Sequence, residues 1–377
     1  EGYKFKKVES LLGVAQNTPG DHLDRLYAAR AKYSSYQGNF NVASGWLQRA
    51  INENPLNDKN IYSLAKLYLK YHKYSRGRSV LKRAMELDPA NIDYRISFAK
   101  VLYEVETSNA AIGYLYSVLE NFPDNSKIYS AIGTYYYRSG QIKKYEDIKE
   151  KILSLPTKDV SLYEFLIESS RLDDNVDKMI EYSESLILIS PGNLKERLNL
   201  ASTYIGLQKY KKAKKHLDAI SSRYDSYPKL QLLYAKLYFL IDKVDKATML
   251  AEREIKENPT VEDGYNLLGD IYIKEKDLIK ARKFYLKAMK INPKNIAANM
   301  GVAYIAFHRD RYDMALDQYQ KVIEIDPSRS DVYRLLGDVY RKLGQSQLAI
   351  RNYKQFLEIS PNSQYKNSIK TYIRTLE

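Results

Sequence analysis

Small, apolar and proline residues recur along this chain with a fixed period of 34 residues. Ten consecutive blocks align without an insertion or deletion, and they start at Asp24, Asp58, Ile92, Ser126, Val160, Leu194, Pro228, Glu262, Ile296 and Ser330. A block of this length cannot bury its apolar face alone, so copies must stack on one another. The pattern predicts a linear array of one repeated unit, whose function lies on the surfaces that the array creates.

Three positions within the block carry the strongest constraints. Position 8 is Ala or Gly in nine blocks, position 20 is small in eight, and position 32 is proline in eight. Small residues let two helix axes approach closely, and proline ends a helix because it lacks an amide donor. Tyrosine and leucine fill further core positions, chiefly 11 and 24. Each block is therefore predicted to fold as helix, turn, helix.

The block at residues 262–295 shows the pattern most fully. Its residues at positions 4, 7, 8, 11, 20, 24, 27 and 32 are Tyr265, Leu268, Gly269, Tyr272, Ala281, Tyr285, Ala288 and Pro293. This arrangement resembles the tetratricopeptide repeat, over residues 24–363. The pentatricopeptide repeat, a helical RNA-binding relative, has a slightly longer period and does not need this pattern. The resemblance implies an all-α fold, a right-handed α-solenoid (superhelix) of helix-turn-helix repeats, whose first helices line a concave groove.

The two ends of the chain flank the ten blocks. Residues 4–17 have the phase of a second helix and an apolar stripe, so residues 1–23 are expected to form a partial N-terminal repeat or capping helix. Residues 364–377 resemble the C-terminal capping helix of such arrays, in which Tyr365, Ile369 and Tyr372 can cover the last apolar face. No shift in composition marks a boundary between them, so the blocks are expected to form one solenoid domain.

Two consecutive blocks depart from the pattern. The block at residues 126–159 has Tyr145 at position 20 and Lys149 at position 24, and the block at residues 160–193 has Ile167 and Met179 at positions 8 and 20. Repeat drift, absorbed by rearranged packing, is one explanation. A bend or hinge in the middle of the chain is the other.

Composition limits the chemistry and suggests a source. The chain has no cysteine, which excludes disulfides, thiol catalysis and thiolate metal sites. Its 36 tyrosines, with abundant lysine, isoleucine and asparagine, suggest a bacterial protein, and the lack of thiols favours the cell envelope or periplasm, with the cytoplasm as the alternative. No apolar run approaches the length of a transmembrane helix. Because the sequence opens at Glu1 without an initiator Met, a removed N-terminal signal or anchor is left open.

The net charge of +14 is distributed unevenly over the blocks. The blocks starting at residues 58 and 194 each carry eight basic and three acidic residues, whereas those starting at residues 92 and 160 have net charges of −3 and −5. A nucleic-acid track is expected to keep one sign along its length, and this chain does not. The densest basic run, at residues 209–215, falls on a predicted second helix and is interpreted as a solvated outer face, with docking to an anionic surface as the alternative.

In the family that this chain resembles, positions 2, 5, 9, 12 and 13 line the groove, and here these positions change sign along the chain. The early blocks contribute Arg25, Lys32, Tyr36, Lys59, Tyr62, Lys66, Lys70, Lys100, Tyr103, Lys127 and Tyr137, and the late blocks contribute Asp263, Asp270, Asp331 and Asp338. Lysine pairs with carboxylates and tyrosine offers rigid contact area, so the first half predicts an acidic protein segment and the second half a basic one. An alternative for Tyr62 and Tyr103 is that they only pack between helices.

Signals for catalysis, metals and cofactors are absent from the sequence. The four histidines fall at unrelated phases, and no phosphate-binding glycine loop or zinc-protease motif occurs. Adjacent carboxylates such as Asp173 and Asp174 fall in a predicted turn. The lysine and asparagine set with which some tetratricopeptide co-chaperones hold a terminal carboxylate is also missing, because position 5 of the first blocks is Ala28, Tyr62 and Ile96.

These observations favour a non-enzymatic scaffold that binds protein segments in its groove, within a bacterial multiprotein assembly such as envelope, pilus, secretion or motility machinery. This assembly is suggested by analogy with the resembled family and by composition. The alternative is a solenoid that binds nucleic acid or another polyanion through its net positive charge. No cofactor is expected.

Overall fold

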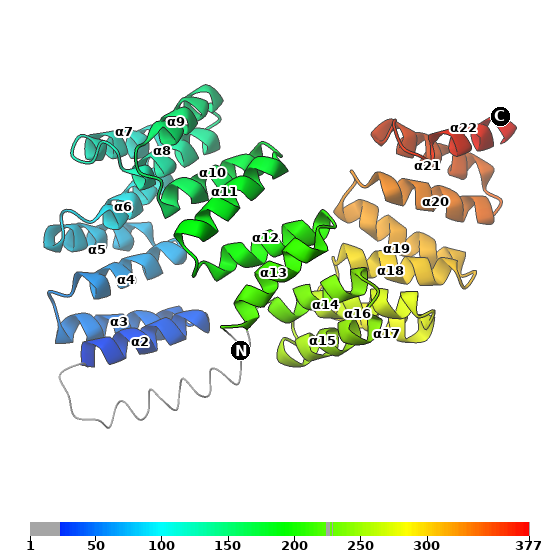
Figure 1. The fold of residues 1–377 in the computed structure, drawn as a ribbon, viewed down its shortest axis with the longest axis horizontal. Helices are drawn as coiled ribbons and strands as arrows, with labels where there is room; N and C mark the ends of the chain where they lie inside the picture. The colour runs from blue at the N-terminus through cyan, green and yellow to red at the C-terminus, as the bar shows by residue number, and fades with distance from the viewer. Residues whose placement is uncertain (1–22, 224–226, 228, 377) are drawn as a thin grey trace. The chain divides into compact units, whose positions relative to one another are not determined.

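The structure, a computed structural model, describes residues 23–223, 227 and 229–376, apart from a few side chains. Twenty-one α-helices and no strand occur in this part of the chain, and successive helices form antiparallel pairs (Figure 1). The predicted all-α solenoid of helix-turn-helix repeats is confirmed. The apolar helix expected at residues 4–17 lies outside the described residues.

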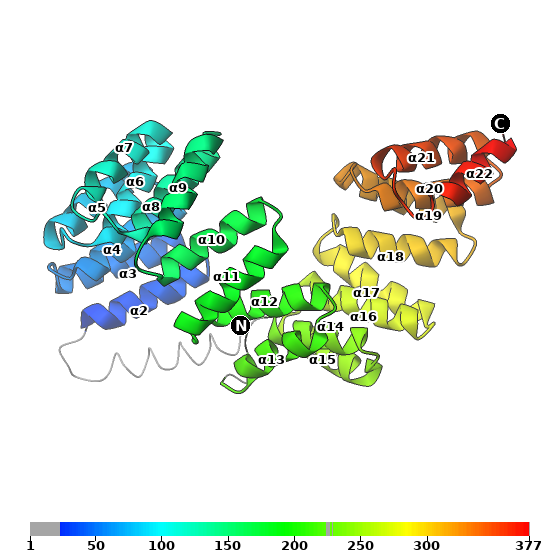
Figure 2. The same cartoon turned by 45° about the horizontal axis from the view of Figure 1, so that its top comes forward.

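Contacts divide the chain into two compact units, residues 1–196 and 197–377, which are described separately. The helices of the first unit are α2 (Leu23–Tyr36), α3 (Phe40–Glu53), α4 (Asp58–Lys70), α5 (Tyr74–Leu87), α6 (Ile92–Val105), α7 (Ser108–Leu119), α8 (Ser126–Arg138), α9 (Ile142–Ser154), α10 (Val160–Leu172) and α11 (Val176–Ile189). In both Figure 1 and Figure 2, the first and second helices of a repeat, such as α2 and α3, lie side by side.

Helix α12 (Leu194–Gly206) spans the division between the units. The helices that follow are α13 (Tyr210–Ser221), α14 (Leu230–Leu240), α15 (Val244–Glu257), α16 (Glu262–Lys274), α17 (Leu278–Ile291), α18 (Ile296–Phe307), α19 (Tyr312–Ile325), α20 (Ser330–Lys342), α21 (Ser346–Ile359) and α22 (Lys366–Leu376). Helix α22 closes the apolar end of the second unit, because Ile369 and Ile373 are buried against Tyr353 and Phe356 of α21.

The first helix of most repeats begins at a side-chain cap in position 34 of the preceding block. Asn57, Asn125 and Asn295 each accept a hydrogen bond from the backbone N–H three residues later, at 3.2, 3.2 and 2.8 Å. Such caps satisfy amides that have no partner within the helix. The prolines at position 32 predict where the second helices end, whereas the caps at position 34 are a further signal for where the first helices begin.

The turn between the two helices of a repeat has one recurring backbone conformation. Position 15 has a positive φ in nine of the ten blocks, at Gly38, His72, Gly140, Asp174, Gln208, Asp242, Lys276, Asp310 and Gly344. The exception is Glu106, with φ of −111°. The turn geometry therefore repeats although the residue type does not.

The side chains at positions 8 and 24 of a repeat have complementary volumes. Where position 8 is alanine, as at Ala65, the buried partner is commonly leucine, here Leu81. Where position 8 is glycine, as at Gly269, the partner is Tyr285, and a Cβ added at position 269 would overlap the tyrosine ring. Interiors are packed at crystal-like density, so the small residue and its large partner form one packing unit.

The atypical repeats of the first unit retain a buried core. Tyr145 and Ile167 are each 3% exposed, and the ring of Phe165 from α10 fills the space beside Gly133 of α8. Lys149, which replaces an apolar residue, forms an ion pair of 2.5 Å with Asp173 in the turn of the next repeat. Rearranged packing therefore accommodates the unusual residues, and a bend at this place stays a prediction.

Candidate protein-binding grooves

The predicted groove residues of the first unit lie on the first helices of its repeats. Arg25 and Lys32 are on α2, Lys59, Tyr62 and Lys66 on α4, Lys100 and Tyr103 on α6, and Lys127 and Tyr137 on α8. All of the lysines and Arg25 are exposed. The side chain of Tyr36 lies outside what the structure describes.

A hollow of about 580 Å³ lies between α2 and α4. Its lining includes three lysines, Lys32, Lys66 and Lys70, and an apolar floor that contains Leu47 and Leu67. Lys70 donates a hydrogen bond of 3.1 Å to the carbonyl of Ser35 at the end of α2. The structure thus brings together three of the predicted lysines, two from position 9 and one from position 13, around a surface that can take apolar side chains.

Tyr62 packs between α4 and α6 and does not line this hollow. Its hydroxyl lies 2.9 Å from the Ser97 hydroxyl, its ring centroid lies 4.5 Å from that of Tyr94, and burial raises its pKa. The Lys66 ammonium lies 4.6 Å from the centroid of the Tyr62 ring. Tyr62 therefore contacts Lys66 through a cation–π interaction.

Tyr103 also packs against a neighbouring helix. Its ring is stacked on that of Tyr135 from α8, with 4.7 Å between the centroids. Tyr137 is 39% exposed and its ring centroid lies 5.3 Å from that of buried Tyr145. Tyr103, like Tyr62, thus packs between first helices, whereas Tyr137 has an exposed surface that a partner could contact.

Lys100 and Lys127 differ in how far their charges are already balanced. Lys127 forms an ion pair of 3.1 Å with Asp93 on the preceding repeat. Within the described part of the chain, Lys100 forms no ion pair. Among the described residues, the charge of Lys127 is therefore balanced by an ion pair and that of Lys100 is not.

A second hollow, of about 420 Å³, lies in the second unit among α12, α14, α16 and α18. It contains two predicted residues, Asp263 and Asp270, together with Lys229, Lys236 and Asn266. Desolvation of the carboxylate raises the pKa of Asp270, although the hydrogen bond of 2.6 Å that it accepts from the Tyr285 hydroxyl acts to lower it. Lys229 and Lys236 lie at positions 2 and 9, which are among the groove positions named above. They were absent from the prediction because it considered only the acidic residues of the late blocks.

The acidic residues at the C-terminal end are already paired with arginines. Asp331 accepts two hydrogen bonds from Arg329, at 2.9 and 2.7 Å, and these bonds lower its pKa. Asp338 accepts from Arg334 at 2.9 Å and from the Tyr353 hydroxyl at 2.7 Å. These pairs balance much of the negative charge that the sequence places at this end.

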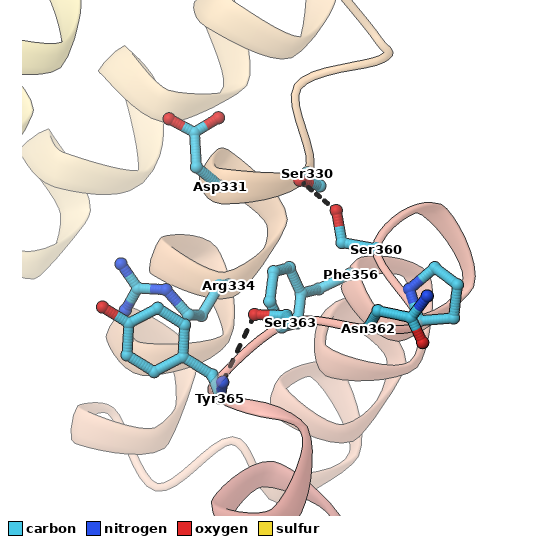
Figure 3. A pocket seen from close by; sticks show the side chains of 9 residues that line it. Ser330, Asp331, Arg334, Phe356, Ser360, Asn362, Ser363 and Tyr365 are labelled. Carbon is cyan, nitrogen blue, oxygen red and sulfur yellow. Dashed lines mark hydrogen bonds between the residues drawn. The ribbon is translucent and has the colours of Figure 1, made fainter. Parts of the chain in front are cut away.

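Figure 3 shows a third hollow, of about 580 Å³, between α20 and the segment leading into α22. The Arg334 guanidinium lies 4.5 Å from the Tyr365 ring centroid, and Ser360 donates a hydrogen bond of 2.7 Å to Ser330. The Asp331 carboxylate points away from Tyr365 (Figure 3). The hollow is therefore framed by contacts that hold α22 in place.

The described residues hold no group of three or more His, Cys, Asp or Glu side chains that could bind a metal ion. In the same part of the chain, none of the helices has the length and apolar character of a membrane span. His22 lies outside the described residues.

Comparisons with known families identify the repeat. Two profiles described as tetratricopeptide repeat match residues 262–295 and 294–362. This chain contains tetratricopeptide repeats. The matched segments cover the last three blocks, in which the small residues and the proline of the repeat are all present.

Curated relatives of this chain are distant. It is 22% identical over 283 residues to a "BBSome complex member BBS4 homolog" of Drosophila melanogaster, covering 71% of this chain and 58% of the relative. It is 21% identical over 333 residues to a "Tetratricopeptide repeat protein 21 homolog" of Caenorhabditis elegans, covering 81% of this chain and 25% of the relative. The chain thus spans about a quarter to somewhat over half of these two relatives.

A solved structure resembles this chain in fold. The "Crystal structure of APC/C hetero-tetramer Cut9-Hcn1" matches with a TM-score of 0.52 and 13% identity, covering 100% of this chain and 94% of the matched chain. Identity at this level supports the fold alone.

Proposed function

We propose that this protein is a non-enzymatic scaffold that holds protein segments in the grooves of its first helices. The observation that carries the proposal is the hollow between α2 and α4, where three lysines surround an apolar floor. A partner with carboxylates and a few apolar side chains would pair with the lysines and bury its apolar residues on the floor. An acidic segment is therefore the proposed ligand of the first unit.

The named relatives support a role in protein assemblies. One is described as a member of the BBSome complex. In the second unit, a preference for basic segments rests on Asp263 and Asp270, because Asp331 and Asp338 are paired with arginines.

Charge reversal in the hollow tests the scaffold proposal. We expect Lys32→Glu with Lys66→Glu to weaken binding of a fluorescein-labelled synthetic acidic peptide about tenfold or more, since two attractive contacts become repulsive. Fluorescence anisotropy measures the affinity, and pull-downs compare the proteins retained. Lys82→Glu, an exposed lysine on the outer helix α5, is the matched control. Unchanged affinity and unchanged retained proteins in the double variant would refute the acidic-segment assignment.

Binding of nucleic acid or another polyanion is the second candidate, motivated by the net charge of +14. It predicts an affinity for generic DNA or RNA that falls steeply with salt, because each phosphate contact releases counterions. A shallow salt dependence with weak affinity favours the scaffold.

We also propose, on the basis of composition, that the scaffold belongs to an assembly of the bacterial cell envelope. The absence of cysteine and the abundance of tyrosine and lysine motivate it, whereas the two relatives described above come from animals. Fractionation of the source organism, with an antibody to this chain, tests the envelope against the cytoplasm.

A further inference from the structure

Helix α17 has an unusually basic outer face. It carries five basic residues and no acidic one. Arg282, Lys283, Lys287 and Lys290 line a hollow of about 500 Å³ together with Arg309 from the turn after α18, and among the described residues none of these five forms an ion pair. Two aliphatic side chains lie in the same surface, Ile279 at 71% exposure and Leu286 at 39%.

This basic face is only one helix wide. The corresponding helix of the preceding repeat, α15, carries four acidic and three basic residues, and that of the following repeat, α19, carries three acidic residues and one basic residue. A membrane plane or a nucleic-acid duplex would extend over those carboxylates as well. A single narrow acidic segment lying along α17 avoids them, and its apolar residues can contact Ile279 and Leu286.

The chain itself contains such a segment in α11, the outer helix of the block with a net charge of −5. Asp177, Glu181 and Leu188 are exposed and lie four and seven residues apart, which places them on one helix face. Leu188 is 81% exposed. Glu184, which already has an interaction within its own chain, is on the same face.

The two faces match residue by residue when the helices run antiparallel. The facing pairs are Leu188 with Ile279, Glu184 with Lys283, Glu181 with Leu286 and Asp177 with Lys290. In this register the apolar residues meet at one end, and Glu181 lies beside Lys287. A parallel arrangement would instead place Leu188 against Lys290. We propose that α17 of one copy of this protein docks α11 of a second copy, in antiparallel orientation.

The contact joins different faces of the two copies, so it leaves α17 of one and α11 of the other unoccupied. Such a heterologous contact allows further copies to add, either to a closed ring or to an open chain. One pair of short helices buries less area than a standard interface, so the association is expected to be weak and concentration-dependent. It uses outer helices and leaves the grooves of the first helices accessible.

Sedimentation velocity of the full chain over a range of concentrations tests this contact. We expect the average sedimentation coefficient of the natural sequence to rise with concentration and to fall with added salt. Asp177→Lys alone and Lys290→Asp alone should each weaken self-association about tenfold, since an attractive pair becomes repulsive. An equimolar mixture of the two variants should recover it, because each variant then meets an opposite charge on the other.

Asp147→Lys on α9 and Lys215→Asp on α13 are controls with the same charge changes on other exposed outer positions. Circular dichroism checks that all variants fold. Three outcomes overturn the proposal: a sedimentation coefficient independent of concentration, single variants that behave like the controls, or a mixture that does not recover. Binding of phosphatidylglycerol vesicles or duplex DNA that Lys290→Asp abolishes, without self-association of the natural sequence, assigns the α17 face to that ligand instead.

Discussion

At the scale of single residues, the turn within each repeat has a backbone conformation that the residue types do not reveal. Position 15 adopts a positive φ in nine blocks, yet only three of these residues are glycine. Asp174, Asp242 and Asp310 tolerate this conformation better than most residues, but Lys276 does not. Sequence comparison between blocks could not find the position, because the shared property is a backbone angle and the side chains vary.

Substitution of Lys276 tests the strain at this position. Lys276→Gly is expected to raise the free energy of unfolding by about 0.5–1 kcal/mol, because glycine adopts φ of 64° without a steric penalty. Urea denaturation followed by circular dichroism measures the change.

Gly344→Ala provides the opposite substitution in the same turn of another repeat. It should lower stability by about 1 kcal/mol, since its φ is 70° and an added Cβ meets no atom within 4 Å, so only the backbone is affected. If Lys276→Gly destabilises the protein, the turn is not strained and the explanation fails.

At the scale of helices, Asp159 connects the starts of two first helices in consecutive repeats. Its carboxylate accepts a hydrogen bond from the backbone N–H of Leu162 at 2.9 Å, which caps α10, and another from the buried Ser126 hydroxyl at the start of α8, at 2.6 Å. The sequence predicted where α8 and α10 begin from the block period. It did not predict this link, because the two residues are 33 positions apart and belong to different blocks.

Removal of the Asp159 carboxylate should therefore cost more than removal of an ordinary cap. We expect Asp159→Ala to lower the free energy of unfolding by about 2–3 kcal/mol and Asn125→Ala, which removes a cap alone, by about 1 kcal/mol. Adding Ser126→Ala to Asp159→Ala should recover part of the difference, because no buried hydroxyl is then left without a partner. Equal losses for the two single caps would contradict a coupling between the helices.

At the scale of the whole molecule, the 34-residue period was enough to predict the repeat fold, because it specifies which small and large residues must meet. The charge of the grooves was harder to predict. Lys32 and Lys66 do line one hollow, but Asp331 lies beside Arg329, and Tyr62 packs against α6. Whether the charge of a groove residue is balanced by an ion pair depends on side-chain rotamers and on residues of neighbouring helices, and the period specifies neither.

Contacts in each unit join mainly neighbouring helices, so damage should remain local. Ile373→Ser removes an apolar side chain from the buried face of the closing helix α22, where Ile373 is 6% exposed. We expect faster amide hydrogen exchange in α20, α21 and α22, and no change in α4 to α8. Mass spectrometry of peptides locates the effect. Faster exchange throughout the chain would contradict this nearest-neighbour behaviour.

The ring of Tyr285 has a glycine on each side, Gly269 in its own repeat and Gly301 in the next, and a methyl group at either glycine would overlap it. No single replacement at these three sites is neutral: a bulkier residue at either glycine displaces the ring, and a smaller residue at 285 leaves a void. We therefore expect residues 269, 285 and 301 either to be conserved or to change together, so that substitutions at these positions covary among homologous sequences. This coupling would connect the evolution of two neighbouring repeats.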